Sequence, residues 1–187
     1  GTAITNHPNG ADGDAAIIKA VTAIRGVQLI TVEGRGMLGV PGVAARIFSA
    51  VATTGATVPL ITEASSEQSL CFAVPTDMSA AVLAVLEETL AREVERRNID
   101  RIWASEEVVI VTVVCPNMRH RLGVAGKVFS ALGDSGVNVL AIAHGSSEVS
   151  ISLVVTVEDL QTTISALHHL TNGQGINRPI ETLKTQP

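Results

Sequence analysis

The residues that most suggest chemistry are a cluster of glycines, Gly34-Arg35-Gly36-Met37-Leu38-Gly39, between an expected strand and an expected helix. Their spacing matches G-x-G-x-x-G, the phosphate-binding turn of dinucleotide sites, and Glu63 follows at the end of the next expected strand. A dinucleotide-binding unit needs a crossover helix after that strand, whereas here the next strand follows within a hairpin. We therefore favour a glycine-rich loop whose backbone N–H groups bind a small ligand, and a carboxylate suits such a loop.

Patterns for catalysis or metal binding are weak elsewhere in the chain. The five histidines (His7, His120, His144, His168 and His169) show no metal-ligand spacing. No G-x-S-x-G turn and no phosphate-loop lysine occurs. Cys71 and Cys115 are both expected inside strands as buried free thiols, because neither a disulfide nor a metal pair is indicated. We predict no catalytic residue and no metal site.

A duplication organises the chain. The segment 31–74 aligns without a gap on 112–155, so that Ser65 corresponds to Ser146 at a constant shift of 81 residues. Both copies contain G-V-A, F-S-A and S-S-E-x-S. A period of this length is typical of a duplicated small domain. Duplication favours a pair of related binding pockets.

Composition narrows the class of protein. The 187 residues are 46% hydrophobic and 2% aromatic, so a core must be built chiefly from aliphatic side chains. The net charge of −5 comes without a basic stripe, which argues against nucleic acid, and apolar runs are too short to span a bilayer. No secretory signal is visible at the start, which favours the cytoplasm. The opening GTAIT lacks Met and suggests a fragment of a longer polypeptide.

Hydrophobic periodicity predicts the order β-α-β-β-α-β in each copy. In the first copy we expect strands at residues 27–32, 57–62, 70–74 and 101–104, with helices at 43–53 and 79–97. In the second we expect strands at 108–114, 137–143 and 149–157, with helices at 122–133 and 160–170. The second copy is then one strand short, and a spare strand at 16–24 can complete it.

This order predicts an α+β fold of two ferredoxin-like units, each an antiparallel sheet with both helices on one face. The first unit, residues 27–105, is expected to be inserted in the second, residues 16–26 plus 106–172. The ends, 1–15 and 173–187, are expected to be flexible. The two units can pair edge to edge or back to back, and either arrangement covers exposed strand edges.

A free amino acid needs a carboxylate cradle, an acceptor for its ammonium group and a small side-chain pocket. Gly36, Gly39 and Gly42 let the first loop approach such a ligand, and residues 117–123 form the matching loop of the second copy. Polar candidates are the backbone carbonyls of Thr57-Val58 and Asn138-Val139 and the side chains of Glu63, Asn138 and His144. Ordinary solvated strand ends remain the alternative for Glu63 and His144. For Ser66 and Ser147 we favour a role as turn residues, and direct contact with the ligand is the alternative.

Three stretches resemble the regulatory region of aspartate kinases, most closely that of bifunctional aspartokinase–homoserine dehydrogenases. They are V-E-G-R-G-M-x-G-V-P-G-V-A-A-R-I-F-S-A, I-T-E-A-S-S-E-Q-S-L-C-F-A-V-P and I-A-H-G-S-S-E-V-S-I. The resemblance runs from about Gly1 to Asp159. It implies tandem ACT domains, the first inserted in the second, which bind an end-product amino acid. It also implies an upstream kinase domain that phosphorylates aspartate with ATP and Mg, whereas no cofactor is expected in this fragment.

The resemblance also implies the effector-binding positions. In the threonine-sensitive type, glutamines precede A-S-S-E and G-S-S-E, and here Glu63 and His144 stand there. Asn at the second-strand start is kept as Asn138, and Thr57 takes its place in the first copy. A glutamate favours a cationic effector such as lysine, although threonine stays the favoured effector. The expected set is Met37, Gly39, Val40, Pro41, Gly42, Thr57, Val58, Glu63, Ser66, Asn138, Val139, His144 and Ser147.

The leading hypothesis is an allosteric amino-acid sensor that dimerises through its ACT domains and has no chemistry of its own. Effector binding can bias an absent kinase domain only by its difference in affinity between two arrangements. One alternative is a dimerisation module without a functional effector site. Another is a free-standing ACT repeat protein.

Overall fold

The computed structural model describes residues 18–35, 41–63, 69–115, 118, 121–144 and 150–171. The expected loops at both ends of the chain and all of the residues between β2 and β3 lie outside these ranges. In chain order the elements are β1 (Ala20–Glu33), α1 (Val43–Thr53), β2 (Leu60–Glu63), β3 (Ser69–Pro75), a 3₁₀ turn (Thr76–Met78), α2 (Ser79–Thr89), α3 (Ala91–Glu95), β4 (Arg101–Val114), α4 (Val124–Asp134), β5 (Ala141–His144), β6 (Ser150–Thr156) and α5 (Leu160–Thr171).

The six strands of the described residues form one antiparallel sheet in the order β2-β3-β1-β4-β6-β5. The last part of β1, from Val27 to Glu33, pairs with β3 in the first copy. The first part, from Ala20 to Ile24, pairs with the end of β4, which in turn pairs with β6. The start of β1 therefore supplies the fourth strand of the second copy, and the first unit is inserted in the second. Of the two predicted arrangements, the units join edge to edge through β1 and β4.

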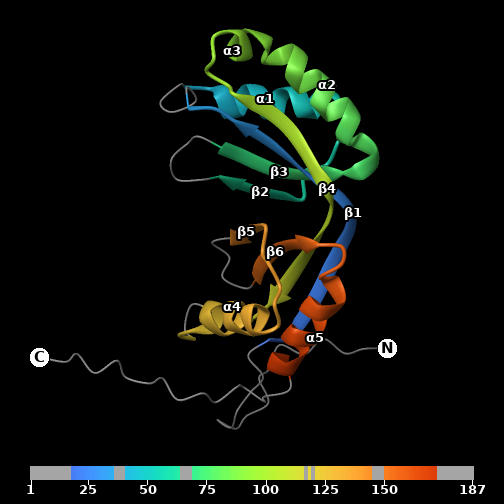
Figure 1. Cartoon of the computed structure of the whole chain (residues 1–187), viewed down its shortest axis with the longest axis vertical. Helices are drawn as coiled ribbons and strands as arrows, with labels where there is room; N and C mark the ends of the chain where they lie inside the picture. Colours follow the sequence, from blue (N-terminus) through green and yellow to red (C-terminus); the bar gives the residue numbers. More distant parts are fainter. Residues whose placement is uncertain are drawn as a thin grey trace, which may run out of the picture.

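Helices cover the outer face of the curved sheet at both ends of the molecule, α1 and α2 at one end and α4 and α5 at the other (Figure 1). In β1, Ile30 and Val32 point to the helix side and pack with Phe72 and Leu86, whereas Leu29 points to the other face. A matching core under α4 and α5 includes Val111 and Leu153 of the second copy. A third, smaller apolar cluster lies on the opposite face, where β2 and β5 approach each other.

Several boundaries differ from the prediction. The strands expected at 16–24 and 27–32 form one strand, β1, whose pairing with β4 shifts beside Gly26 at a φ of +69°. The strands expected at 101–104 and 108–114 likewise form one strand, β4. The helix expected at 79–97 is broken at the buried Leu90 into α2 and α3. The second strands of the two copies, expected at 57–62 and 137–143, begin only at the equivalent residues Leu60 and Ala141.

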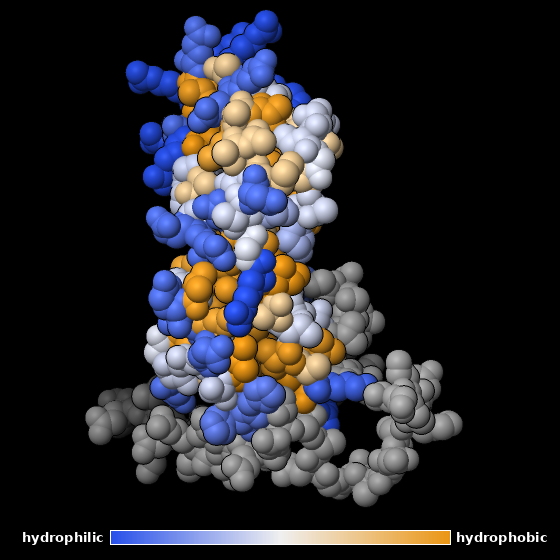
Figure 2. All heavy atoms as spheres, turned by 90° about the vertical axis from the view of Figure 1, so that its right-hand side faces the viewer, coloured by the Kyte–Doolittle hydropathy of each residue, from blue (hydrophilic) through white to orange (hydrophobic). Residues whose placement is uncertain are grey.

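The surface mixes hydrophilic and hydrophobic side chains. Figure 2 shows hydrophilic side chains at the top and down one edge of this face, with hydrophobic side chains reaching the surface between them in both halves. Exposed large hydrophobic residues include Ile24 and Val157, which are 46% and 44% exposed. Among the described helices, none has the length and apolar character to cross a membrane.

Candidate functional site

A cavity of about 400 Å³ opens beside the start of α4 in the second copy. Its walls come from the loop before α4, the first turns of that helix, and the strands β5 and β6. The lining residues are Met118, Arg121, Leu122, Gly123, Val124, Ala125, Gly126, Phe129, Ile142, His144 and Ile151. The helix start, which the sequence predicts as a carboxylate cradle, therefore borders a space large enough for a free amino acid.

The first turn of α4 carries N–H groups that no side chain caps. Gly123 immediately precedes the helix at a φ of +78°, a left-handed conformation that favours glycine. The first N–H groups of a helix have no partner within the helix, and the helix dipole makes this end partly positive. A ligand carboxylate at this end of the cavity would accept hydrogen bonds from these N–H groups and would be attracted by the partial positive charge.

His144, at the end of β5, supplies a second polar group at the cavity. Its Nδ1 lies 3.0 Å from the backbone oxygen of Ser150. Because a carbonyl oxygen only accepts, Nδ1 must carry the proton in this contact. In the neutral ring Nε2 is then left as an acceptor, which is the role an amino-acid ammonium group requires.

The rest of the lining is mostly apolar. Met118, Phe129, Ile142 and Ile151 contribute hydrocarbon or thioether surface, and Arg121 is the cationic member. No aspartate or glutamate belongs to the described lining. The cavity therefore suits a ligand whose side chain is small and uncharged.

Other predicted residues of the second copy lie away from this lining. Asn138 is exposed in the segment before β5, and Val139 packs against the core under α4 and α5. Ser147 lies outside the described residues. The backbone carbonyls at the strand start and the Asn138 side chain stay predictions as ligand contacts.

The first copy repeats part of this geometry. Gly42 precedes α1 at a φ of +83°, again with no side-chain cap, and follows the exposed Pro41. Glu63 ends β2 at the position that corresponds to His144, and its side chain is exposed. Thr57 is exposed before β2, whereas Val58 packs against the first core. The other predicted members, Met37, Gly39, Val40 and Ser66, lie outside the described residues.

Neither thiol indicates chemistry. Cys71 lies in β3 as predicted, whereas Cys115 follows the last residue of β4 rather than lying within it, and both are free. Burial raises the pKa of the Cys71 thiol, partly offset by a hydrogen bond from Thr31, and it raises the pKa of Cys115 as well. Within the described ranges, no cluster of three potential metal ligands occurs.

Sequence reasoning missed the apolar part of the cavity. Met118 lies in the loop predicted at 117–123, whereas Phe129 and Ile151 lie outside it, and only the fold brings them beside that loop. One signal was available, because Phe129 belongs to the repeated F-S-A and corresponds to Phe48 in the first copy. A bulky residue at matched positions in the first helix of each copy indicates a shared packing role.

Three kinds of comparison identify the relatives of this chain. The ACT-domain family profile matches residues 30–90 and 111–170. The bifunctional aspartokinase/homoserine dehydrogenase 1 of maize is 38% identical over 169 residues, which cover 90% of this chain and 18% of that protein. The bifunctional enzyme of Haemophilus influenzae is 36% identical over 151 residues, 81% of this chain and 18% of that protein.

Among solved structures, the regulatory subunit of aspartate kinase from Thermus flavus matches with a TM-score of 0.70 and 25% identity. The match covers 82% of this chain and 98% of that subunit. The chain spans less than a fifth of the length of the maize and Haemophilus relatives. Since the two profile matches together cover more than half of its residues, the chain belongs to the ACT-domain family and contains two copies of the domain.

Proposed function

We propose that this chain is the regulatory region of an aspartate kinase and binds an end-product amino acid, threonine in preference to lysine. The region itself performs no reaction. The proposal is supported by the sequence similarity to bifunctional aspartokinases and by the near-complete overlap with a Thermus regulatory subunit. Effector binding would act on the kinase by favouring one arrangement of the ACT units over another.

The cavity beside α4 is the observation that carries the proposal. The ligand carboxylate would accept from the uncapped N–H groups after Gly123, and the ammonium group would donate to Nε2 of His144. A threonine side chain would lie against Met118 and Ile151. Lysine would bring a second ammonium group against a mostly apolar lining, which disfavours it.

The first copy offers a second candidate site with different chemistry. Glu63 takes the position of His144 there, and a carboxylate favours a cationic side chain. We therefore keep lysine as the alternative effector for the first copy, with the predicted contacts at Pro41, Gly42, Thr57 and Val58. The predicted contacts Met37, Gly39, Val40 and Ser66 belong to the same proposed site.

Calorimetric titration of the full chain with threonine, lysine, methionine and isoleucine tests the proposal. Threonine should bind, and His144→Leu should weaken it about tenfold or more, because a charged donor loses its acceptor. Glu63→Leu is the matched control, because it changes the same position of the other copy and should leave threonine binding in the second copy unchanged. The proposal is wrong if no amino acid binds, and its effector assignment is wrong if lysine binds while threonine is inert.

Self-association is a second proposed property, favoured by apolar residues around the cavity mouth. Leu122 is 97% exposed, and Leu140 and Ile142 are each 44% exposed beside the open edge of β5. We propose a homodimer through the ACT domains that covers these side chains. Light scattering should give a dimer for the chain and a monomer for Leu122→Asp. A dimer that binds no amino acid would favour the dimerisation module over the sensor.

The remaining part of the proposal concerns the whole polypeptide. A kinase domain that uses ATP and Mg to phosphorylate aspartate would stand elsewhere in the same protein, in the cytoplasm. The reading frame around this segment tests this directly. An adjacent kinase-coding region would support it, and its absence would favour a free-standing ACT repeat protein.

A further inference from the structure

We propose that Glu93 and Asp100 are positioning residues that hold the two flanks of the glycine-rich loop of the first copy. Both belong to the segment from Ala91 to Asp100, which connects α2 to β4. The flank before the loop is the end of β1, and the flank after it is α1. The link to effector binding rests on the proposed function, because only there is this loop a ligand loop.

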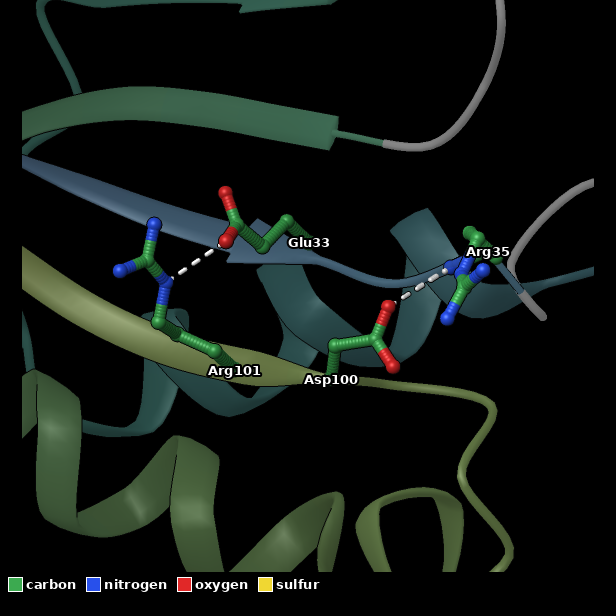
Figure 3. Close-up of polar contacts among 4 residues, drawn as sticks. All are labelled: Glu33, Arg35, Asp100 and Arg101. Atoms are coloured by element: carbon green, nitrogen blue, oxygen red, sulfur yellow. Dashed lines mark hydrogen bonds and ion pairs between the residues drawn. The ribbon is translucent and has the colours of Figure 1, made fainter.

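Asp100 holds the flank that precedes the loop. The backbone N–H of Arg35 donates to Oδ2 of Asp100 at 3.2 Å, and the N–H of Asp100 donates to the backbone oxygen of Glu33 at 2.8 Å. In the next pair along the strands, Nε of Arg101 lies 2.6 Å from Oε1 of Glu33 (Figure 3). The end of β1 is therefore bonded to the start of β4 through side-chain and backbone groups together.

Gly34 shows how closely these two segments approach. A Cβ at this position would lie 2.3 Å from the backbone oxygen of Asn98 and 2.5 Å from Cα of Ile99. Both distances are far below van der Waals contact, so only glycine fits without a backbone shift. This close approach places the N–H of Arg35 within reach of the Asp100 carboxylate.

Glu93 holds the flank that follows the loop. Its Oε1 pairs with the guanidinium of Arg46, near the start of α1, and its side chain is only 16% exposed. The second carboxylate oxygen, Oε2, is buried without a hydrogen-bond partner among the described residues. A carboxylate in that environment depends on Arg46, and the pair fixes α1 against α3.

The two anchors form one unit. The N–H groups of Asn98 and Ile99 both donate to the backbone oxygen of Glu93, at 2.8 and 3.2 Å. Arg97 completes this turn at a φ of +58°, a left-handed conformation uncommon for a residue with a Cβ. Glu93 and Asp100 are thus joined through a closed turn, and a shift of either flank must move the other or break a contact.

The second copy lacks this arrangement in its described part. Lys19 takes the place of Asp100 there, because its N–H donates to the backbone oxygen of Val114 at 2.8 Å as Asp100 does to Glu33. The backbone hydrogen bond is kept, but Lys19 has no carboxylate that could accept a hydrogen bond as Asp100 does from Arg35. The position of Gly34 is occupied by Cys115, which packs with Ile18. Among the described residues, the positioning role is therefore confined to the first copy. The strand β4 starts at Arg101, next to Asp100, and continues into the second copy.

Amide hydrogen exchange on the full chain, followed by NMR without any ligand, tests the proposal. Asp100→Ala should speed exchange at Arg35 by about tenfold, the loss of one hydrogen bond to a charged group. Asp100→Asn keeps an acceptor oxygen and should restore most of the protection. Glu93→Ala should speed exchange in the first turns of α1 and leave the matching turns of α4 unchanged.

Lys19→Ala is the matched control, and it should leave both flanks of the first loop as they are. Unchanged exchange in Asp100→Ala and Glu93→Ala would overturn the proposal. So would equal loosening of α1 and α4, which would indicate general destabilisation. Because exchange needs no ligand, a chain that binds no amino acid refutes the proposed function and leaves the positioning test intact. If the chain binds an amino acid at the first copy, Asp100→Ala should weaken that binding while Asp100→Asn preserves it.

Discussion

At matched positions the two copies place Gly34 and Cys115 at the end of an equivalent strand. In the first copy the neighbouring strand is reached through the turn at Asn98, whose backbone leaves no room for a Cβ. In the second copy the neighbouring strand is the start of β1, and Ile18 packs against the cysteine side chain. The same position in the fold thus requires glycine where the backbone of a neighbouring turn lies against it, and accepts a larger residue where a side chain does. The first glycine of the G-x-G-x-x-G match is explained by this packing, without a dinucleotide.

The substitution Gly34→Ala is the most direct test of this comparison and should have the largest effect. The added Cβ meets backbone atoms, which cannot move aside as a side chain does, so we expect a loss of about 1–3 kcal/mol in the free energy of unfolding. Gly133→Ala in α4 is the control, because a Cβ there meets nothing within 4 Å. That change should stabilise by about 0.5–1 kcal/mol, as alanine is the better helix former. Thermal melts of both variants check the pair, and equal effects would contradict the close approach.

A second matched pair lies on the face of the sheet away from the helices. In the second copy Oγ1 of Thr112 and Oγ of Ser152 are 2.9 Å apart, whereas in the first copy Oγ1 of Thr31 donates to Sγ of Cys71 at 3.5 Å. Sulfur is the weaker acceptor. Thr112→Val should therefore cost about 0.5–1.5 kcal/mol, and Thr31→Val should cost clearly less. Urea unfolding of the two variants sharpens the comparison, and a larger loss for Thr31→Val would contradict it.

Much of the fold could be predicted because the repeat and the periodicity agree. The helix predicted at 43–53 has those bounds in the structure, and the strand count of the second copy correctly requires a strand from before the first. The continuous strand β1 was missed because Gly26 reads as a break in a sequence, whereas a left-handed glycine here lets β1 continue. The break at Leu90 was missed because helical periodicity continues across it, and only burial of that residue marks the turn.

The candidate site could be predicted only in its local parts. The glycine before each helix and the strand-end residue His144 follow from loop chemistry that a sequence displays. The apolar wall depends on which side chains of α4, β5 and β6 face one another, which is a tertiary property. Likewise, Glu93 reads as one acid among many on a charged helix, and its contact with Arg46 needs α3 to turn back toward α1.

The smallest expected effect comes from that ion pair and depends on pH. The hydrogen bond from Arg46 holds the pKa of Glu93 below its ordinary value, although partial burial opposes it. A carboxyl group whose pKa is lowered in the folded state contributes stability above its unfolded pKa of about 4.3, and this contribution is lost as the pH falls through the folded value.

Glu93→Gln should therefore destabilise by at most about 1 kcal/mol at pH 6, since Arg46 is partly exposed and water screens the pair. The difference from the unchanged chain should shrink toward pH 3, because the contribution of the pair is lost as Glu93 becomes protonated in the folded state. Glu95→Gln, an exposed acid on the same helix, is the control and should show little effect at either pH. Urea unfolding at both pH values measures this, and a difference that grows toward acid would mean that the pair does not stabilise the first copy. The loss should be confined to α1 and its neighbours, because the pair joins α1 to α3. Amide exchange can locate it, with Lys127 of α4, which corresponds to Arg46, as the reference position.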